Sequence, residues 1–378
     1  MPSLLKSPRA AVMAVFAAFG ATVGGFAGST PQMMAQAGLD NATFGFAVTA
    51  MTIAGVTSMS MAGALARRFS HRFLLLALPP AMLALLALTL TAGSMALFFV
   101  AITLYGLAMG ATDVIMNAEA GAIEVDMKRP VYTGFHGSVS LSVAVFAILS
   151  SLLSTRYGTL ATMVPVAIAM LLAMIWVWIA VPARPLPLAE GARSGFGGFT
   201  RPLVLTGVAA GLIIASEITA LFWSSKLLAE TAPQFAAIAG LGASFFGLTN
   251  ALVRFPGDAL RARFGEFRLM GATLSVAILG FVGLGFSNGF AANVFFFALI
   301  GMGLAVLPPC LFALAARQTP HNRAAGLSVA MLVAGAPRIV APTLFGAIAA
   351  STSTRIAFGL CALMLLGAYF TIRKLARS

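Results

Sequence analysis

Charged residues are scarce in this chain. Only 9% of its 378 residues are charged, and 60% are hydrophobic, whereas a soluble domain carries about 25% charged residues. So few charges cannot cover a water-exposed surface, and the mean hydropathy of +0.99 is high. The composition therefore predicts an all-α protein with most of its outer surface in lipid, and it excludes an ordinary soluble domain.

Cysteine and histidine are also rare. The only two cysteines, Cys310 and Cys361, fall inside apolar runs, which favours small packing residues over a disulfide framework or a metal cluster. The three histidines, His71, His136 and His321, each lie near a predicted loop. No phosphate-binding loop and no HExxH motif occur. We therefore expect no enzyme, no ATP-driven machine, no metal and no cofactor.

The charge that is present is mostly positive. The chain has 23 Lys and Arg against 10 Asp and Glu, a net charge of +13. These residues lie in the gaps between apolar runs, which argues for the positive-inside rule and against a nucleic-acid partner. With a cytoplasmic N-terminus, 19 basic residues fall in cytoplasmic segments and only Arg156, Lys226 and Arg355 fall outside, with Arg338 inside a run. This bias predicts that both termini are cytoplasmic and that the number of spans is even.

Twelve apolar runs are long enough to be membrane spans of about 20 residues each. They fall at 10–30, 43–64, 73–92, 95–118, 136–155, 159–181, 202–224, 235–254, 268–287, 290–315, 325–348 and 354–372. A segment rich in Pro, Gly and Arg, 182–200, separates the first six runs from the last six. We therefore predict an N-terminal six-helix bundle over 1–181, a cytoplasmic linker over 182–200 and a C-terminal six-helix bundle over 201–378.

The two halves of the chain repeat one another. A shift of 195 residues places Arg68-Phe69-Ser70 on Arg263-Phe264-Gly265, and Gly106 on Gly301. Two alike six-span halves joined by a polar linker resemble the major facilitator superfamily along the whole chain. The resemblance implies two pseudo-symmetric bundles that alternate access to a site between them. It also implies a monomer in the bacterial inner membrane.

The loop after the second run, residues 63–72, resembles the superfamily's short inner-loop signature. Arg67 stands where that signature has an acid, whereas the copy after the eighth run keeps Asp258. Asp258 with Arg254 or Arg261 therefore forms a candidate charge latch on the cytoplasmic side, and a basic loop that only sets topology is the alternative. The other loop residues that we assign to this gate are Arg68 and Arg263.

A polar stripe marks the fourth run. At 100° per residue, Asp113 and Asn117 lie about 40° apart on a helix, and Glu124 about 20° from Asp113. With the later motif from Phe135 to Gly137, this stretch resembles a YbjJ/MosC-like branch of the superfamily, which implies sugar-like or cyclitol-like solutes. We assign proton coupling to Asp113, solute binding to Asn117 and gating to Glu124. A structural hydrogen-bond network at the inner end of the span is the alternative.

Two charges mark the second half. Glu217 is the only acid well inside its spans, and we assign it to proton coupling, with a fixed salt bridge as the alternative. Arg338 lies near the middle of the eleventh run, where it must pair with an acid such as Glu217 or bind an anionic or hydroxylated solute. Weaker candidates for solute binding are Tyr105, Gln32, Asn250 and Trp223.

These residues predict a secondary active transporter for a sugar-like, cyclitol or organic-anion solute, coupled to protons. Its partners would be the solute, protons and membrane lipid. The 30 Phe and 19 Met also suit a multidrug or metabolite exporter with a large apolar cavity. A membrane scaffold or sensor that does not transport is the alternative of another class, and the degenerate first inner loop favours it.

Overall fold

The structure is a computed structural model that describes residues 6–128, 131–183, 198–319 and 323–377, and all regular secondary structure in these parts is helical. The helices before residue 184 are α2 (Pro8–Ala37), α3 (Asn41–Arg68), α4 (His71–Leu90), α5 (Met95–Met127), α6 (Tyr132–Tyr157), η1 (Thr159–Thr162) and α7 (Met163–Ala180). Those after residue 197 are α8 (Arg201–Thr231), η3 (Pro233–Ile238), α9 (Leu241–Arg254), α10 (Gly257–Phe264), α11 (Glu266–Phe286), α12 (Phe290–Leu304), α13 (Leu307–Arg317), α14 (Arg323–Ser351) and α15 (Thr354–Leu375).

Eleven helical segments in the described residues are long and apolar enough to cross a membrane. The predicted span over 235–254 is not among them, because the structure divides it between η3 and α9. With 14 residues, α9 is roughly 21 Å long, less than the about 30 Å of the hydrocarbon core. The twelve-span count therefore stays a prediction.

Polar residues at the ends of the runs fix where the helices begin. The Asp40 carboxylate accepts a hydrogen bond from the Thr43 backbone N–H at 2.8 Å, and the Asp40 backbone N–H donates to the Thr43 hydroxyl at 3.0 Å, so the pair forms a capping box at the start of α3. The bonds that the carboxylate accepts from the Thr43 N–H and hydroxyl lower the pKa of Asp40. Ser70, Ser94 and Ser353 accept equivalent bonds at the starts of α4, α5 and α15. Short capped turns therefore hold successive spans antiparallel.

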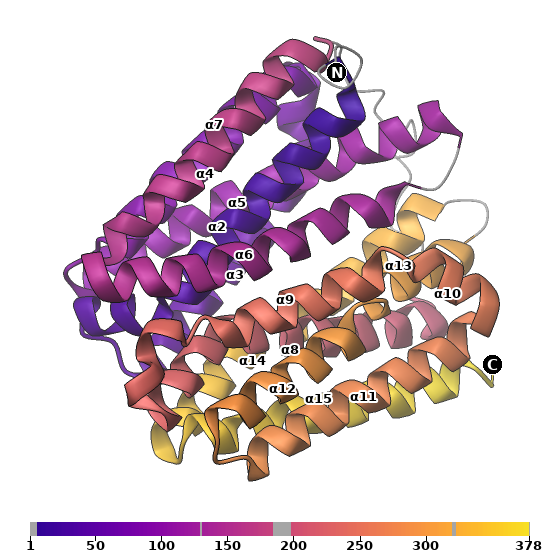
Figure 1. Cartoon of the computed structure of the whole chain (residues 1–378). Helices are drawn as coiled ribbons and strands as arrows, with labels where there is room; N and C mark the ends of the chain where they lie inside the picture. The colour runs from indigo at the N-terminus through magenta and orange to yellow at the C-terminus, as the bar shows by residue number, and fades with distance from the viewer. Residues whose placement is uncertain (1–5, 129–130, 184–197, 320–322, 378) are drawn as a thin grey trace.

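The same pattern of helix packing occurs twice. α2 packs on α6 and α7, α3 packs on α5, and α4 packs on α5 and α7; likewise α8 packs on α14 and α15, α9 packs on α12, and α11 packs on α12 and α15. The two sets meet where α6 contacts α9, α3 contacts α14, and α2 contacts α8. Figure 1 shows the indigo-to-magenta helices lying together on one side and the orange-to-yellow helices on the other. The domain boundaries stay a prediction, and most of the proposed linker, 184–197, lies outside the described residues.

Both chain termini lie at the same end of the bundle (Figure 1), which we call the terminal end; the other is the distal end. The short turns that lie beside basic residues, such as 69–70 after Arg68 and 255–256 after Arg254, also lie at the terminal end, because the helices alternate in direction. The cytoplasmic orientation of this end rests on the positive-inside rule and stays a prediction.

Glycine allows two of these contacts to be very close. A Cβ on Gly106 of α5 would lie 2.3 Å from the Met51 carbonyl oxygen of α3. A Cβ on Gly45 of α3 would lie 2.5 Å from the Pro342 carbonyl oxygen of α14, so α3 and α14 nearly touch near the distal end. Small residues at such crossings let helix backbones approach in lipid.

Gly106→Ala should therefore destabilise the bundle, because its Cβ would displace backbone. We expect the free energy of unfolding to fall by about 1–3 kcal/mol, the usual effect of overpacking, measured by thermal unfolding in detergent. Gly121→Ala on the same helix is the control, since a Cβ there meets nothing within 4 Å. Equal melting temperatures for the two variants would contradict the close approach.

Candidate functional site

Arg254 at the end of α9 is the centre of a polar network inside the bundle. Its Nη2 donates to Glu217 Oε1 of α8 at 3.1 Å, its Nη1 to Ser140 Oγ of α6 at 2.9 Å, and its Nε to the Ala305 carbonyl at 3.1 Å. The Arg254 and Glu217 side chains are only 12% and 15% exposed. One guanidinium therefore joins three other segments through all three of its nitrogens.

The Ala305 carbonyl is free to accept because the tenth predicted span is broken. α12 ends at Leu304 and α13 begins at Leu307. In a continuous helix residue 309 would donate its N–H to Ala305, but Pro309 has none. Arg254 supplies the missing donor, so the break in the backbone and the position of the guanidinium fit together.

The network crosses from the first set of helices to the second. Ser140 Oγ of α6 receives a bond from Arg254 and donates to Asn250 Oδ1 of α9 at 3.0 Å. Asn250, which we predicted to bind solute, is 1% exposed. In this conformation it ties α9 to α6 and presents no surface to a solute.

A second polar group lies on α5. Asn117 Nδ2 donates to Asp113 Oδ1 at 2.9 Å and to its carbonyl at 2.8 Å, and the Tyr132 hydroxyl of α6 donates to Asn117 Oδ1 at 2.6 Å. Asp113 and Asn117 are half-buried. We expected Asp113 near the inner end of its span, but α5 extends to Met127, so Asp113 lies close to the middle of the helix.

Glu124 lies apart from this group. Its Oε2 accepts the backbone N–H groups of Val131 and Tyr132 at 2.8 and 2.7 Å, at the start of α6. An acid suits this position because helix N-termini carry free N–H groups and a positive partial charge. The structure thus gives Glu124 a capping contact in place of the gating contact that we predicted.

Arg338 of α14 lies at the same level as the two acids. Counted along α8, α14 and α5 from the terminal end, Glu217, Arg338 and Asp113 are 16, 15 and 14 residues deep, or roughly 21–24 Å. The charges of Asp113 and Glu217 both act on Arg338. The pairing of Arg338 with Glu217 is nevertheless wrong for this conformation, since Glu217 binds Arg254. Within the described residues Arg338 Nε is buried without a hydrogen-bond partner.

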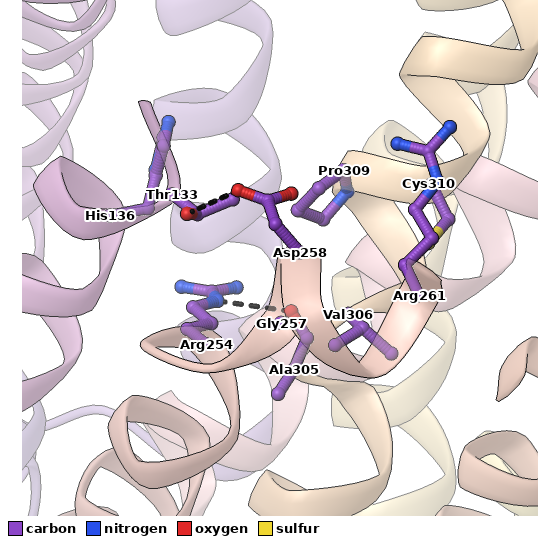
Figure 2. Close-up of a pocket in the computed structure, with 10 residues that line it drawn as sticks. All are labelled: Thr133, His136, Arg254, Gly257, Asp258, Arg261, Ala305, Val306, Pro309 and Cys310. Carbon is purple, nitrogen blue, oxygen red and sulfur yellow. Dashed lines mark hydrogen bonds between the residues drawn. The ribbon is translucent and has the colours of Figure 1, made fainter. Parts of the chain in front are cut away.

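A small hollow of about 20 Å³ lies between this network and the terminal end, room for roughly one water. Figure 2 shows Asp258 of α10 reaching across it to Thr133 of α6, whose hydroxyl donates to Asp258 Oδ2 at 3.0 Å. The predicted latch of Asp258 with Arg254 or Arg261 is wrong, because Arg254 binds Glu217 and Arg261 binds Glu266 at 3.0 Å.

The two other basic residues that we assigned to the gate lie on the surface. Arg68 and Arg263 are exposed at the ends of α3 and α10. The Arg263 guanidinium lies 5.4 Å from the ring of its neighbour Phe264. Neither position joins the two sets of helices in this conformation, whereas Asp258 does so through Thr133.

An aromatic layer closes the distal half of the interior. It consists of Phe26, Phe44, Tyr105, Phe222, Trp223 and Phe345. The Phe44 and Trp223 rings, from α3 and α8, are 4.8 Å apart, and Phe26 of α2 lies 4.8 Å from Phe222 of α8. Tyr105 and Trp223 are 1% and 0% exposed. We predicted that both bind solute, but in this conformation Trp223 packs on Phe44 of the other set, and Tyr105 packs on Phe26 within its own set.

Gln32 is the last of the predicted solute-binding residues. Its Nε2 donates to Thr155 Oγ1 at 2.7 Å, near the distal ends of α2 and α6. Both residues precede position 182, so this bond joins two helices of the first set. The structure places it away from Glu217, Arg338 and Asp113.

One buried pair, His71 and Glu119, was not predicted from the sequence. His71 Nδ1 lies 2.5 Å from Glu119 Oε2, between α4 and α5, and both side chains are 1% exposed. We placed His71 near a loop and assigned no role to Glu119, and no local pattern joins residues 48 positions apart. No group of three His, Cys, Asp or Glu suited to a metal occurs in the described parts of the chain.

Comparisons with known proteins show which proteins this chain resembles. A family profile described as Major Facilitator Superfamily matches residues 228–377. An uncharacterized MFS-type transporter of Yersinia pestis is 28% identical over 357 residues, which cover 92% of this chain and 90% of that protein. The chain is thus similar to transporters of the major facilitator superfamily over most of its length.

Two further proteins are similar to this chain. The membrane protein MosC of Rhizobium meliloti is 24% identical over 336 residues, covering 87% of this chain and 81% of MosC, in agreement with the branch that the stretch around Asp113 indicates. The crystal structure of a mutant form of the nucleoside transporter NupG superimposes with a TM-score of 0.76 over 98% of this chain and 100% of that chain, at 13% identity. The chain is thus a multi-pass membrane protein with the fold of that transporter.

Ser140→Ala tests the network around Arg254. It removes a hydrogen bond to a charged group, so we expect the free energy of unfolding in detergent to fall by about 1.5–3 kcal/mol. Ser154→Ala on the same helix is the control, because the buried Ser154 hydroxyl donates to the Ser151 carbonyl of its own helix at 3.2 Å. An equal loss in both variants would show that the bond to Arg254 contributes nothing.

Proposed function

We propose that the chain is a secondary active transporter that moves a small polar solute by alternating access, driven by protons, in the bacterial inner membrane. The observation that carries the proposal is the Arg254 network, which links an acid inside the membrane, Glu217, to a helix of the opposite set through Ser140. A monomer suffices for this mechanism, because both sets of helices belong to one chain.

Protonation of Glu217 is the coupling step. The carboxylate holds the Arg254 guanidinium at 3.1 Å, and a proton on Glu217 removes the charge that binds it. Because the same guanidinium donates to Ser140 on α6 and to the Ala305 carbonyl, its release loosens α6 from α9 and from the α12–α13 break. Protonation of Glu217 thereby weakens the contact between α6 of the first set and α9 of the second.

Arg338 is the solute-binding group in this proposal. Its guanidinium has five N–H donors, and it lies within electrostatic reach of Asp113 and Glu217. The two arginines, Arg254 and Arg338, balance these two acids, so a proton on Glu217 leaves a net charge of +1. An organic anion restores the balance, and a sugar-like or cyclitol solute would use its hydroxyl groups on Arg338, Asp113 and Asn117.

Fold similarity adds one further solute to examine. The protein with the superimposable structure is named as a nucleoside transporter, and a nucleoside carries a hydroxylated ribose that the same side chains suit. A useful panel of labelled solutes is therefore D-glucose, myo-inositol, D-gluconate and uridine.

Glu217→Gln is the decisive variant, because it copies the protonated acid. In proteoliposomes we expect the wild type to accumulate a panel solute when a pH gradient is imposed. Glu217→Gln should lose this accumulation yet still exchange the same solute across the membrane in counterflow. The control is Glu230→Gln on the same helix, an acid in an i,i+4 ion pair with Lys226, which should keep both activities.

Undiminished proton-driven accumulation by Glu217→Gln would remove Glu217 from the coupling role. Transport of an amphipathic cation such as tetraphenylphosphonium, with no panel solute moved, would favour the exporter alternative. A chain that moves neither class would favour the scaffold.

A further inference from the structure

Two arginines border a hollow on the outer surface between α11 and α15. The hollow has a volume of about 400 Å³ and lies at the terminal end of both helices. Arg268 stands in the first turn of α11 and Arg373 in the last turn of α15, with Tyr369 between them along the wall. Both arginines are exposed.

The hollow opens toward lipid. Its floor includes Gly271, Ala272 and Ser275 of α11, and a Cβ on Gly271 would meet nothing within 4 Å. On each helix, exposed residues at intervals of three or four continue from the arginine toward the distal end. They are Ala272, Ser275, Leu279, Val282 and Phe286 on α11, and Phe370, Leu366, Leu363, Gly359 and Ile356 on α15. Each arginine therefore ends a lipid-facing stripe, at the level where headgroups lie.

The charge of the hollow is positive, since no acid lines it. The acid closest to it in sequence, Glu266, is bound by Arg261 and Arg317. The Arg373 guanidinium lies 5.8 Å from the centre of the Tyr369 ring, which leaves its N–H groups free to donate in the plane. An anionic group that fits here must bring oxygen acceptors for two guanidinium groups.

The first half of the chain offers an internal comparison. The pair α4 and α7 packs as α11 and α15 do, and the 195-residue shift places Trp178 at the position of Arg373. There the Arg72 guanidinium lies 4.3 Å from the centre of the Trp178 ring, so its face is already covered. The first half thus has one arginine, Arg72, packed on Trp178, whereas the second half has two arginines, Arg268 and Arg373, beside small side chains.

We propose that the α11–α15 hollow binds an anionic phospholipid of the surrounding bilayer. Its phosphate lies between Arg268 and Arg373, which suit phosphate oxygens through paired N–H donors. An acyl chain runs over Gly271, Ala272 and Ser275 and along the two apolar stripes. Basic pockets between membrane helices are suited to such headgroups. The site is independent of the solute site, because none of its residues belongs to the Arg254 network.

Native mass spectrometry of the delipidated, purified chain tests the proposal. Dioleoyl phosphatidylglycerol and dioleoyl phosphatidylcholine share their acyl chains and differ in net charge. We expect the wild type to bind the first roughly ten- to thirtyfold more tightly, since each arginine near a headgroup contributes about 1 kcal/mol. Arg268→Gln/Arg373→Gln should lose this preference, whereas the charge-matched control Arg68→Gln/Arg263→Gln should keep it.

Three outcomes would overturn the proposal. The first is an unchanged preference in Arg268→Gln/Arg373→Gln. The second is an equal loss in the control pair, which would show a general charge effect. The third is that inorganic phosphate displaces phosphatidylglycerol as well as the lipid does itself, which would assign the site to free phosphate. Arg373→Trp, which copies Trp178, offers a second variant if the double variant does not fold, and it should also lose the preference.

Discussion

A charge inside a membrane span needs a counter-charge, and Glu217 and Arg254 supply this for each other. A single ionised side chain at mid-membrane costs about 2.5–3.5 kcal/mol on insertion scales, so neither residue is tolerated there without a partner. The ion pair at 3.1 Å fixes the guanidinium, and the guanidinium in turn fixes Ser140 of α6 and the carbonyl freed by Pro309. The positions of four segments thus depend on one interaction.

The two sets of helices contact each other through two different kinds of interaction. On one side, α6 and α9 are joined by the polar network and by Thr133 and Asp258. On the other, α3 and α14 meet through Gly45 and a hydroxyl contact between Thr49 and Thr343 at 2.8 Å. Of the contacts named here, those between α6 and α9 involve carboxylates that one proton can neutralise, and those between α3 and α14 do not. In the proposed mechanism, protonation of Glu217 therefore acts first on the contact between α6 and α9.

Much of the fold could be predicted from the sequence, because apolar run length and basic loops are local properties. The charged site was only partly predictable. Glu217 and Arg338 stand out as charges within apolar runs, but Arg254 ends a run and resembles a loop residue, although its long side chain reaches inward. Pro309 indicates that the Ala305 carbonyl lacks a backbone donor, but the sequence does not show that Arg254 donates to it. The solute-binding roles of Trp223 and Tyr105 stay predictions, because an aromatic residue in a span has the same sequence pattern whether it packs or binds.

The central claim, that the ionised Glu217 holds α6 against α9 through Arg254, is tested most directly by a distance across that contact. Spin labels at Leu141 of α6 and Leu252 of α9, both exposed, would report it by pulsed electron paramagnetic resonance, with Cys310 and Cys361 replaced by Ala. The account predicts a narrow, short distance distribution at high pH that lengthens as Glu217 is protonated, and a long distribution at every pH in Glu217→Gln. A distribution unchanged by pH and by that substitution would contradict it.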